Sequence, residues 1–187
     1  MNRERFEKMA KESTTSVQLV RHWFDVQYGV SFQIIGDDEQ IAGIEHGWHV
    51  PDLRCQDKPK LTIEVKEDFM ADKTQNLCFE LACIKRYKEW CIYHKKPNAL
   101  FAIVNHHDYR IDVWTCGFDN DRLIKELEFL CAHRPDCSIR HGGDQAHPMY
   151  IIPINVARGM VSCITNQLML ERPRRIFADM AREKLKR

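Results

Sequence analysis

The sequence predicts an α/β domain with a central mixed sheet flanked by helices. Apolar and polar residues alternate strictly over residues 61–66, which is typical of a strand with two different faces. Residues 99–104 are almost continuously apolar, which is typical of a strand covered on both faces. Segments with helical spacing precede and separate these strands. The 187 residues, 44% of them hydrophobic, suffice for one domain with a full core.

The overall composition bounds the class of protein. The net charge of +1 demands no polyanionic partner, so any nucleic-acid surface must be local. No apolar run approaches the roughly 20 residues of a membrane span, and the charged N-terminus precedes no apolar signal segment. Eight cysteines without such a signal are typical of reduced thiols. We therefore expect a cytoplasmic protein with no membrane association.

The N-terminal elements follow from caps, turns and β-rich runs. A charged segment over residues 1–12 is expected to form a short helix or an arm. Serine and threonine residues then offer N-caps for a helix to Tyr28, and Gly29 is a natural C-cap. Strands are expected at 30–35 and from 41 to 44, with a turn at 36–39 between them.

The segment from Pro51 to Lys66 is expected to form a hairpin. Residues 57–60, with an aspartate and a proline, carry a turn signal. Folding about Lys58 pairs apolar with apolar and polar with polar residues, whereas a slip of one residue would break this match. The pairs are Asp52 with Glu64, Leu53 with Ile63, Arg54 with Thr62, and Cys55 with Leu61.

The remaining elements complete a single domain over residues 1–187, without repeats or low-complexity linkers. A long helix is expected over residues 77–93 after a loop. The expected elements after it are a strand at 99–104, a strand at 109–115, a helix at 121–132, a loop at 134–148, a strand at 149–156, a helix at 161–170 and a basic amphipathic helix from Pro173 to the end.

The hairpin places chemistry-bearing side chains close together. Directly opposed residues have Cβ atoms roughly 4.5–5.5 Å apart, so Asp52 and Glu64 can share one divalent cation. Magnesium takes one or two carboxylates, with water and phosphate oxygens, and the Val65 carbonyl is a further candidate ligand. Lys66 shares a face with Glu64 and can orient or deprotonate a water, or stabilise developing phosphorane charge. This set suits hydrolysis of a phosphodiester.

Pro51-Asp52 followed by Glu64-Val65-Lys66 resembles the motif of the PD-(D/E)XK nuclease superfamily. The resemblance implies a restriction-endonuclease-like core over about 13–115, with a C-terminal extension at 116–187. It further implies a DNA nuclease dependent on Mg²⁺ or Mn²⁺ that acts in DNA processing, repair or restriction, with Asp52 and Glu64 as metal ligands and Lys66 as the catalytic amine. The order of the expected elements is similar as well.

The segment after the hairpin resembles a Lys-Thr-Gly-Asn…Glu stretch of phage-associated members, with Gln75 in place of the glycine. Asn76 and Glu80 would share a helix face, where Glu80 is a candidate metal or water contact. The alternative is an exposed helix start with a favourable acid. Candidate DNA contacts, each of which also suits a solvated charged surface, are Lys73, Asn76, Lys85, Arg86, Arg174 and Arg175.

Three further features stay open at this level. An acid on the first helix, Glu7, Glu12 or Asp25, is a candidate extra metal contact, although a surface charge is the more frequent role. A Cys/His-rich stretch suggests Zn²⁺, but its spacing matches no short zinc motif; it contains Cys131, His133, Cys137, His141 and His147. The alternative function is a nucleic-acid-binding or assembly protein that keeps the fold without turnover, and a homodimer is left open.

Overall fold

The computed structural model describes residues 3–35, 37–67, 74–96, 98–105, 110–117, 121–141 and 148–164. Its centre is a five-stranded mixed sheet with the order β1-β2-β3-β5-β6. The strands are β1 (Phe32–Ile34), β2 (Leu53–Cys55), β3 (Leu61–Glu67), β5 (Asn98–Asn105) and β6 (Arg110–Thr115). Strands β3 and β5 run parallel, and the other neighbours are antiparallel. The predicted α/β class with a mixed sheet is confirmed.

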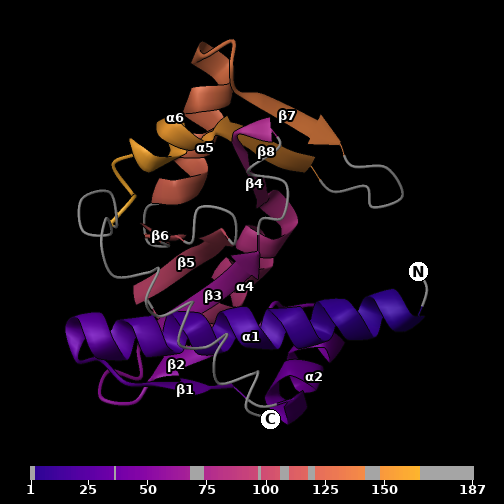
Figure 1. Cartoon of the computed structure of the whole chain (residues 1–187), viewed down its shortest axis with the longest axis vertical. Coiled ribbons are helices and arrows are strands. Elements are labelled where there is room, and N and C mark those ends of the chain that lie inside the picture. Colours follow the sequence, from indigo (N-terminus) through magenta and orange to yellow (C-terminus); the bar gives the residue numbers. More distant parts are fainter. Residues whose placement is uncertain are drawn as a thin grey trace, which may run out of the picture.

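Helices cover both faces of this sheet. Helix α1 (Arg3–Tyr28) crosses its front, and α4 (Leu81–Tyr93) lies behind it (Figure 1). The α1 face buries residues such as Val20 and Phe24 against Ile63 and Val65. The α4 face forms a second buried cluster, which includes Phe101. Two cores on one sheet explain the continuous apolar run of β5, because its side chains from 99 to 104 belong alternately to the two clusters.

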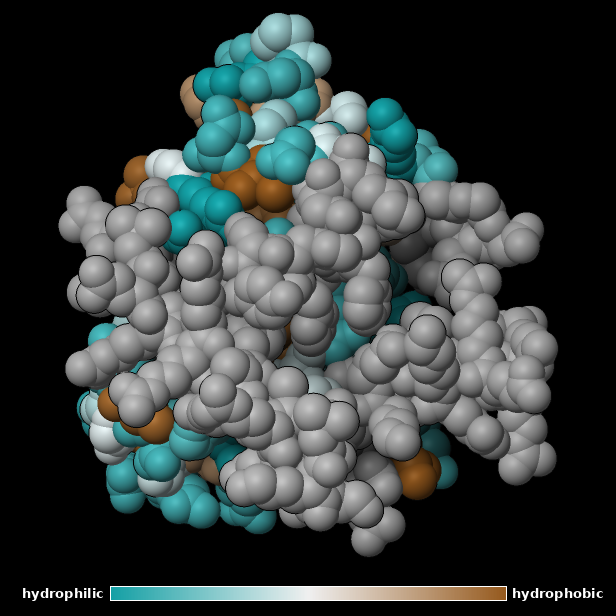
Figure 2. All heavy atoms as spheres, in the orientation of Figure 1, coloured by the Kyte–Doolittle hydropathy of each residue, from teal (hydrophilic) through white to brown (hydrophobic). Residues whose placement is uncertain are grey.

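A second sheet extends the domain at the end that carries α5 (Figure 1). It has the order β4-β8-β7 and is antiparallel throughout. Its elements are β4 (Asn76–Glu80), β7 (Ser138–His141) and β8 (Pro148–Pro153), with α5 (Arg122–His133) and α6 (Ile154–Arg158) packed on β8. Hydrophilic side chains predominate on the visible described surface of this end (Figure 2). No described helix is long and apolar enough to cross a membrane.

The predicted hairpin register is confirmed where β2 and β3 pair. Leu53 lies opposite Ile63, and Arg54 lies opposite Thr62. The turn closes with a 2.7 Å hydrogen bond from the Leu61 amide to the Lys58 carbonyl. Alternation and turn chemistry were therefore sufficient to predict the register.

The prediction of a turn at 36–39 and a strand from 41 to 44 was wrong. Residues Asp37–Glu45 form helix α2. Gly43 lies inside this helix, and a Cβ on it would come within 2.0 Å of a Val50 methyl carbon. The Gly43 carbonyl also accepts hydrogen bonds from the amides of His46 and Trp48. This glycine permits close contact with the following segment and does not interrupt the helix.

Three other boundaries differ from the prediction. The helix expected over 77–93 begins only at Leu81, because the alternating residues Leu77 and Phe79 are buried in strand β4. The loop expected at 134–148 contains β7. Residues 161–164 form a turn and an isolated bridge between Cys163 and Trp114, and not a helix. The predicted basic helix from Pro173 lies outside the described residues, as do Lys73, His147, Arg174 and Arg175.

Candidate active site at the β2–β3 hairpin

Glu64 is the centre of the candidate site. It lies in the middle of β3, and only 1% of it is exposed. Successive strand residues point to opposite faces, so Ile63 and Val65 join the α1 core while Glu64 points toward α4. The alternation predicted for this strand is therefore present, but its polar face is buried under α4. A carboxylate in such a place needs partners.

One oxygen of Glu64 holds all of the partners. Glu64 Oε1 lies 2.5 Å from His49 Nε2 and 2.6 Å from Lys66 Nζ. The Cys83 thiol of α4 donates to the same oxygen at 3.6 Å. Glu64 Oε2 is buried, and nothing in the described part of the chain hydrogen-bonds to it. The carboxylate is thus crowded on one oxygen and free on the other.

Asp52 is held at the same end of the hairpin by backbone hydrogen bonds. Its Oδ2 accepts from the Val65 amide at 2.8 Å, and its carbonyl accepts from the Ile35 amide at 2.9 Å. The N–H and C=O of one residue in an extended strand point to the same side. The Val65 carbonyl therefore faces the side on which Asp52 lies, as a metal ligand there would require.

The surroundings shift the pKa values of Asp52 and Glu64 in opposite directions. Burial, followed by the negative charge of Glu64, raises the pKa of Asp52 to about 7. Burial also acts to raise the pKa of Glu64, but Lys66 and His49 together outweigh it and lower that pKa to about 2. At neutral pH Glu64 is charged, whereas Asp52 is close to its titration midpoint. Two acids with separated pKa values are a common feature of reactive sites.

The surroundings also determine the protonation states of the Lys66 amine and the Cys83 thiol. Burial alone would lower the pKa of Lys66, but the adjacent Glu64 charge raises it above its ordinary value. Lys66 is therefore an ammonium group, which favours charge stabilisation over proton abstraction among its predicted roles. Burial and the Glu64 charge raise the pKa of Cys83, so its sulfur is a neutral thiol.

A divalent cation fits this arrangement. Glu64 Oε2 is buried and accepts no hydrogen bond from the described residues, and burial beside Glu64 destabilises Asp52 as an anion. A cation bound by both carboxyl groups would ligate that free oxygen and would lower the pKa of Asp52, since opposite charge lowers a carboxyl pKa. Two carboxylates and a backbone carbonyl are oxygen ligands of the kind Mg²⁺ takes. Asp52, Glu64 and Val65 are the residues that would hold it.

Glu80 and Asn76 lie on a strand, where a helix was predicted. They are the two ends of β4, so they share a strand face and not the predicted helix face. Glu80 is half-buried just before α4, close enough to Cys83 to raise the pKa of that thiol. Asn76 is half-buried too, and its side chain donates to the Thr74 carbonyl at 2.8 Å. A metal contact by Glu80 stays a prediction.

The basic cluster on α4 divides into exposed and buried members. Lys85 and Arg86 are exposed and remain available for a phosphate backbone. Tyr87 and Trp90 on the same helix are almost fully buried, so these rings cannot stack on bases. Tyr93, by contrast, is 67% exposed, and its ring centroid lies 4.6 Å from that of Trp48.

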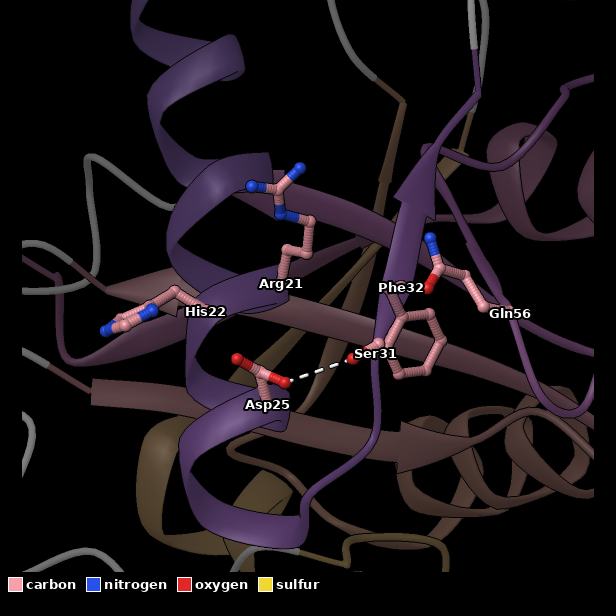
Figure 3. A pocket seen from close by; sticks show the side chains of 6 residues that line it. All are labelled: Arg21, His22, Asp25, Ser31, Phe32 and Gln56. Atoms are coloured by element: carbon pink, nitrogen blue, oxygen red, sulfur yellow. Dashed lines mark hydrogen bonds between the residues drawn. The ribbon is translucent and has the colours of Figure 1, made fainter.

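The candidate acid on the first helix lies elsewhere. Asp25 lines a polar pocket of about 310 Å³ between α1 and β1, together with Arg21 and His22 (Figure 3). Its carboxylate accepts a 3.1 Å hydrogen bond from Ser31. Asp52, Glu64 and Lys66 do not line this pocket, which makes Asp25 a poor candidate for an extra metal contact. The side chains of Glu7 and Glu12 lie outside the described residues.

The predicted zinc stretch does not gather its ligands within the described residues. The described members lie on α5, β7 and the turn between them: Cys131, His133, Cys137 and His141. His133 Nδ1 lies 2.8 Å from the Phe129 carbonyl, within its own helix. Among described residues, the group of three potential metal ligands in mutual reach is His49, Glu64 and Cys83.

Sequence reasoning missed His49 and Cys83 as members of the site. His49 precedes the motif aspartate by three residues and belongs to no short motif. Cys83 lies in a segment of helical spacing, where a cysteine is usually a small apolar core residue. Only the packing of α4 on β3 brings its thiol to Glu64, and no short-range pattern contains that information.

Comparison of the chain with protein-family models, curated proteins and solved structures finds no match.

Proposed function

We propose that the protein is a divalent-metal-dependent deoxyribonuclease that hydrolyses phosphodiester bonds. The observation that carries this proposal is the buried Glu64 carboxylate, which has one unpartnered oxygen and lies beside Asp52 and Lys66 at one end of the hairpin. A buried acid of this kind is costly for stability, and perturbed carboxyl groups cluster at reactive sites.

The order of elements supports the resemblance to the PD-(D/E)XK superfamily. Helix α1 precedes three antiparallel strands, with α2 between the first and the second of them. Asp52 comes directly before the second strand, Glu64 and Lys66 lie on the third, and after β4 a helix leads to a strand parallel to the third. Apart from α2 and β4, this is the order that the resemblance implies for a restriction-endonuclease-like core. The proposal extends this likeness to the chemistry of the site.

Each residue has a definite task in the proposed reaction. Asp52 and Glu64, with the Val65 carbonyl, hold Mg²⁺ or Mn²⁺, which would offset phosphate charge and favour departure of the leaving oxygen. The Lys66 ammonium group stabilises negative charge that develops on the phosphorus-bound oxygens. The side chain of Lys66 is 34% exposed, so it can leave Glu64 for a substrate phosphate. Exposed Lys85 and Arg86 on α4 supply phosphate contacts for DNA.

The same contacts favour one alternative, a DNA-binding protein without turnover. The Lys66 ammonium already neutralises Glu64, to which His49 also hydrogen-bonds, and a closed ion pair of this kind can be purely structural. The two functions differ in what a metal does. A nuclease cuts DNA only with Mg²⁺ or Mn²⁺, whereas the binding protein retains DNA without cutting it.

The test is cleavage of supercoiled plasmid and of single-stranded DNA with Mg²⁺ or Mn²⁺. We expect Asp52→Asn and Lys66→Ala to lower the cleavage rate by about 10²–10³-fold, as removal of a group that stabilises transition-state charge does. Matched controls come from the turn of the same hairpin, where Asp57→Asn and Lys60→Ala change exposed side chains. Equal residual cutting by site variants and controls would refute the nuclease.

A further inference from the structure

A mixed set of metal ligands converges on Glu64. One ligand atom each from His49, Glu64 and Cys83 lies within 4.8 Å of the others. They come from three separate parts of the fold: the segment after α2, the middle of β3 and the first turn of α4. An imidazole, a thiolate and a carboxylate together are typical of Zn²⁺ and similar transition metals, whereas Mg²⁺ favours oxygen ligands alone.

We propose that His49, Glu64 and Cys83 form a binding site for a transition-metal ion such as Zn²⁺. Because Glu64 belongs to this set and also to the Mg²⁺ set, the two ions compete, and Zn²⁺ inhibits the nuclease. The site itself is independent of the proposed function, while the inhibition rests on it.

The geometry permits such a site with small movements. Zinc ligands lie at about 2.0–2.3 Å from the ion, so tetrahedral ligand atoms are roughly 3.5 Å apart. The distance from Glu64 Oε1 to Cys83 Sγ is 3.6 Å, close to this spacing, whereas the 2.5 Å distance to His49 Nε2 must lengthen by about 1 Å. The other change is the departure of Lys66, which contacts both Glu64 Oε1 and His49 Nε2. Its side chain is 34% exposed and can turn to solvent.

The site also has an entry path and an open position. The His49 side chain is 34% exposed, whereas Glu64 and Cys83 are buried, so an ion enters past the imidazole. Three protein ligands leave a fourth position for water. On binding, the Cys83 S–H bond breaks, the sulfur lone pair binds the metal, and the proton goes to solvent.

Competition follows from the different ligand sets. Asp52 is outside the close group of three, so the transition-metal ion lies on the α4 side of Glu64. An ion with a thiolate ligand there removes Glu64 from the pair that would hold Mg²⁺. It also displaces the Lys66 ammonium by like-charge repulsion. Both effects act on groups that the proposed reaction needs.

The test of the site uses Co²⁺ and the full chain without DNA. Binding should produce a near-ultraviolet thiolate-to-cobalt charge-transfer band with one equivalent of metal. Cys83→Ser should abolish the band, and His49→Ala should weaken Co²⁺ binding by at least about tenfold. The matched control is a double Cys131→Ser, Cys137→Ser variant, which removes two cysteines outside the site and should keep the band.

Opposite results would overturn the site. They are the absence of any band in wild type, or a band that survives Cys83→Ser and disappears in the control. Folding of each variant is checked by its unfolding transition, and His49→Ala provides a second reading if Cys83→Ser is unstable.

Inhibition is measured separately as the Zn²⁺ concentration that halves cleavage at constant Mg²⁺. We expect Cys83→Ser and His49→Ala to require at least about tenfold more Zn²⁺, relative to their own uninhibited rates. A cobalt band without any DNA cleavage would support the metal site and refute the nuclease. Cleavage that needs Mg²⁺, with no cobalt band, would do the reverse.

Discussion

Two buried carboxylates on the same sheet show how a structural charge differs from a candidate reactive one. Asp112 on β6 is fully buried, and each of its oxygens has an arginine partner: Oδ1 accepts from Arg110 at 2.7 Å, and Oδ2 accepts from Arg158 at 2.9 Å. Glu64 on β3 is equally buried, but its partners share one oxygen and the other has none among described residues. Complete pairing is expected of a group that stabilises the fold, and incomplete pairing of a group that awaits a ligand.

The largest expected effect is a difference between Asp112 and Glu64 in how much their replacement lowers the free energy of unfolding. In Asp112→Asn the new NH₂ must face an arginine donor, so we expect a loss of about 3–5 kcal/mol in the free energy of unfolding. In Glu64→Gln the NH₂ can take the position of the unpartnered oxygen, and a smaller loss of about 1–3 kcal/mol is expected. Urea unfolding of both variants measures the difference. Equal losses would remove the contrast between the two sites.

The next effect has the opposite sign and concerns Asp52. Its pKa in the folded protein is about 7, above the ordinary 3.8. The protonated form therefore favours folding: this contribution is fully present below pH 3.8 and is lost as the pH rises through about 7. At pH 8 without metal, Asp52→Asn should be more stable than wild type by about 1–3 kcal/mol.

Thermal or urea unfolding from pH 5 to pH 8 with a chelator tests this expectation. The gain of Asp52→Asn over wild type should grow across that range, while the exposed control Asp57→Asn should show no such trend. A variant less stable than wild type at pH 8 would mean that the Asp52 charge supports the fold.

A smaller effect is expected from Mg²⁺ itself. At ten times its Kd, Mg²⁺ should stabilise wild type by about 1.4 kcal/mol, because it binds only the folded state. This corresponds to a rise in Tm of about 3–6 °C for a chain of this size. Asp52→Asn should show little rise, since one carboxylate ligand is gone. A rise of equal size in both proteins would place Mg²⁺ elsewhere.

The smallest effect is expected at a surface pair close to the hairpin. Arg54 on β2 contacts Glu39 of α2, and the two side chains are 30% and 42% exposed. Exposed ion pairs contribute about 0–1 kcal/mol, so Glu39→Gln should change the free energy of unfolding by less than about 1 kcal/mol. This difference should become smaller with added salt, which screens the pair. A larger loss would mean that this exposed pair stabilises the fold as strongly as a buried ion pair does.

The sequence predicted the part of the site that depends on short-range pattern. Alternation over 61–66 and the turn at 57–60 specified which residues pair across the hairpin, and hence that Asp52 and Glu64 lie at the same end. The prediction of a helix over 77–80 was wrong. The alternating pattern of strand β4, in which Leu77 and Phe79 are buried, lasts only five residues before α4 begins. Such a short alternation is hard to distinguish from the helical spacing that follows it.

The parts that could not be predicted depend on contacts between distant segments. The role of Cys83 requires α4 to pack on the face of β3 that carries Glu64, and that of His49 requires α2 to turn the chain back toward the strand. Arg158, one of the two arginines on Asp112, is likewise 46 residues away from it in the sequence. Such distant partners follow from the fold and not from spacing.

The close contact between Gly43 and Val50 has a consequence for how this sequence can vary. A side chain at position 43 would displace Val50, the residue next to His49, and so move the imidazole away from Glu64. In any homologue that keeps the site, we expect a residue larger than glycine at this position only together with a smaller one at position 50. The two positions should therefore covary, and a set of related sequences would reveal the geometry of the site without any structure.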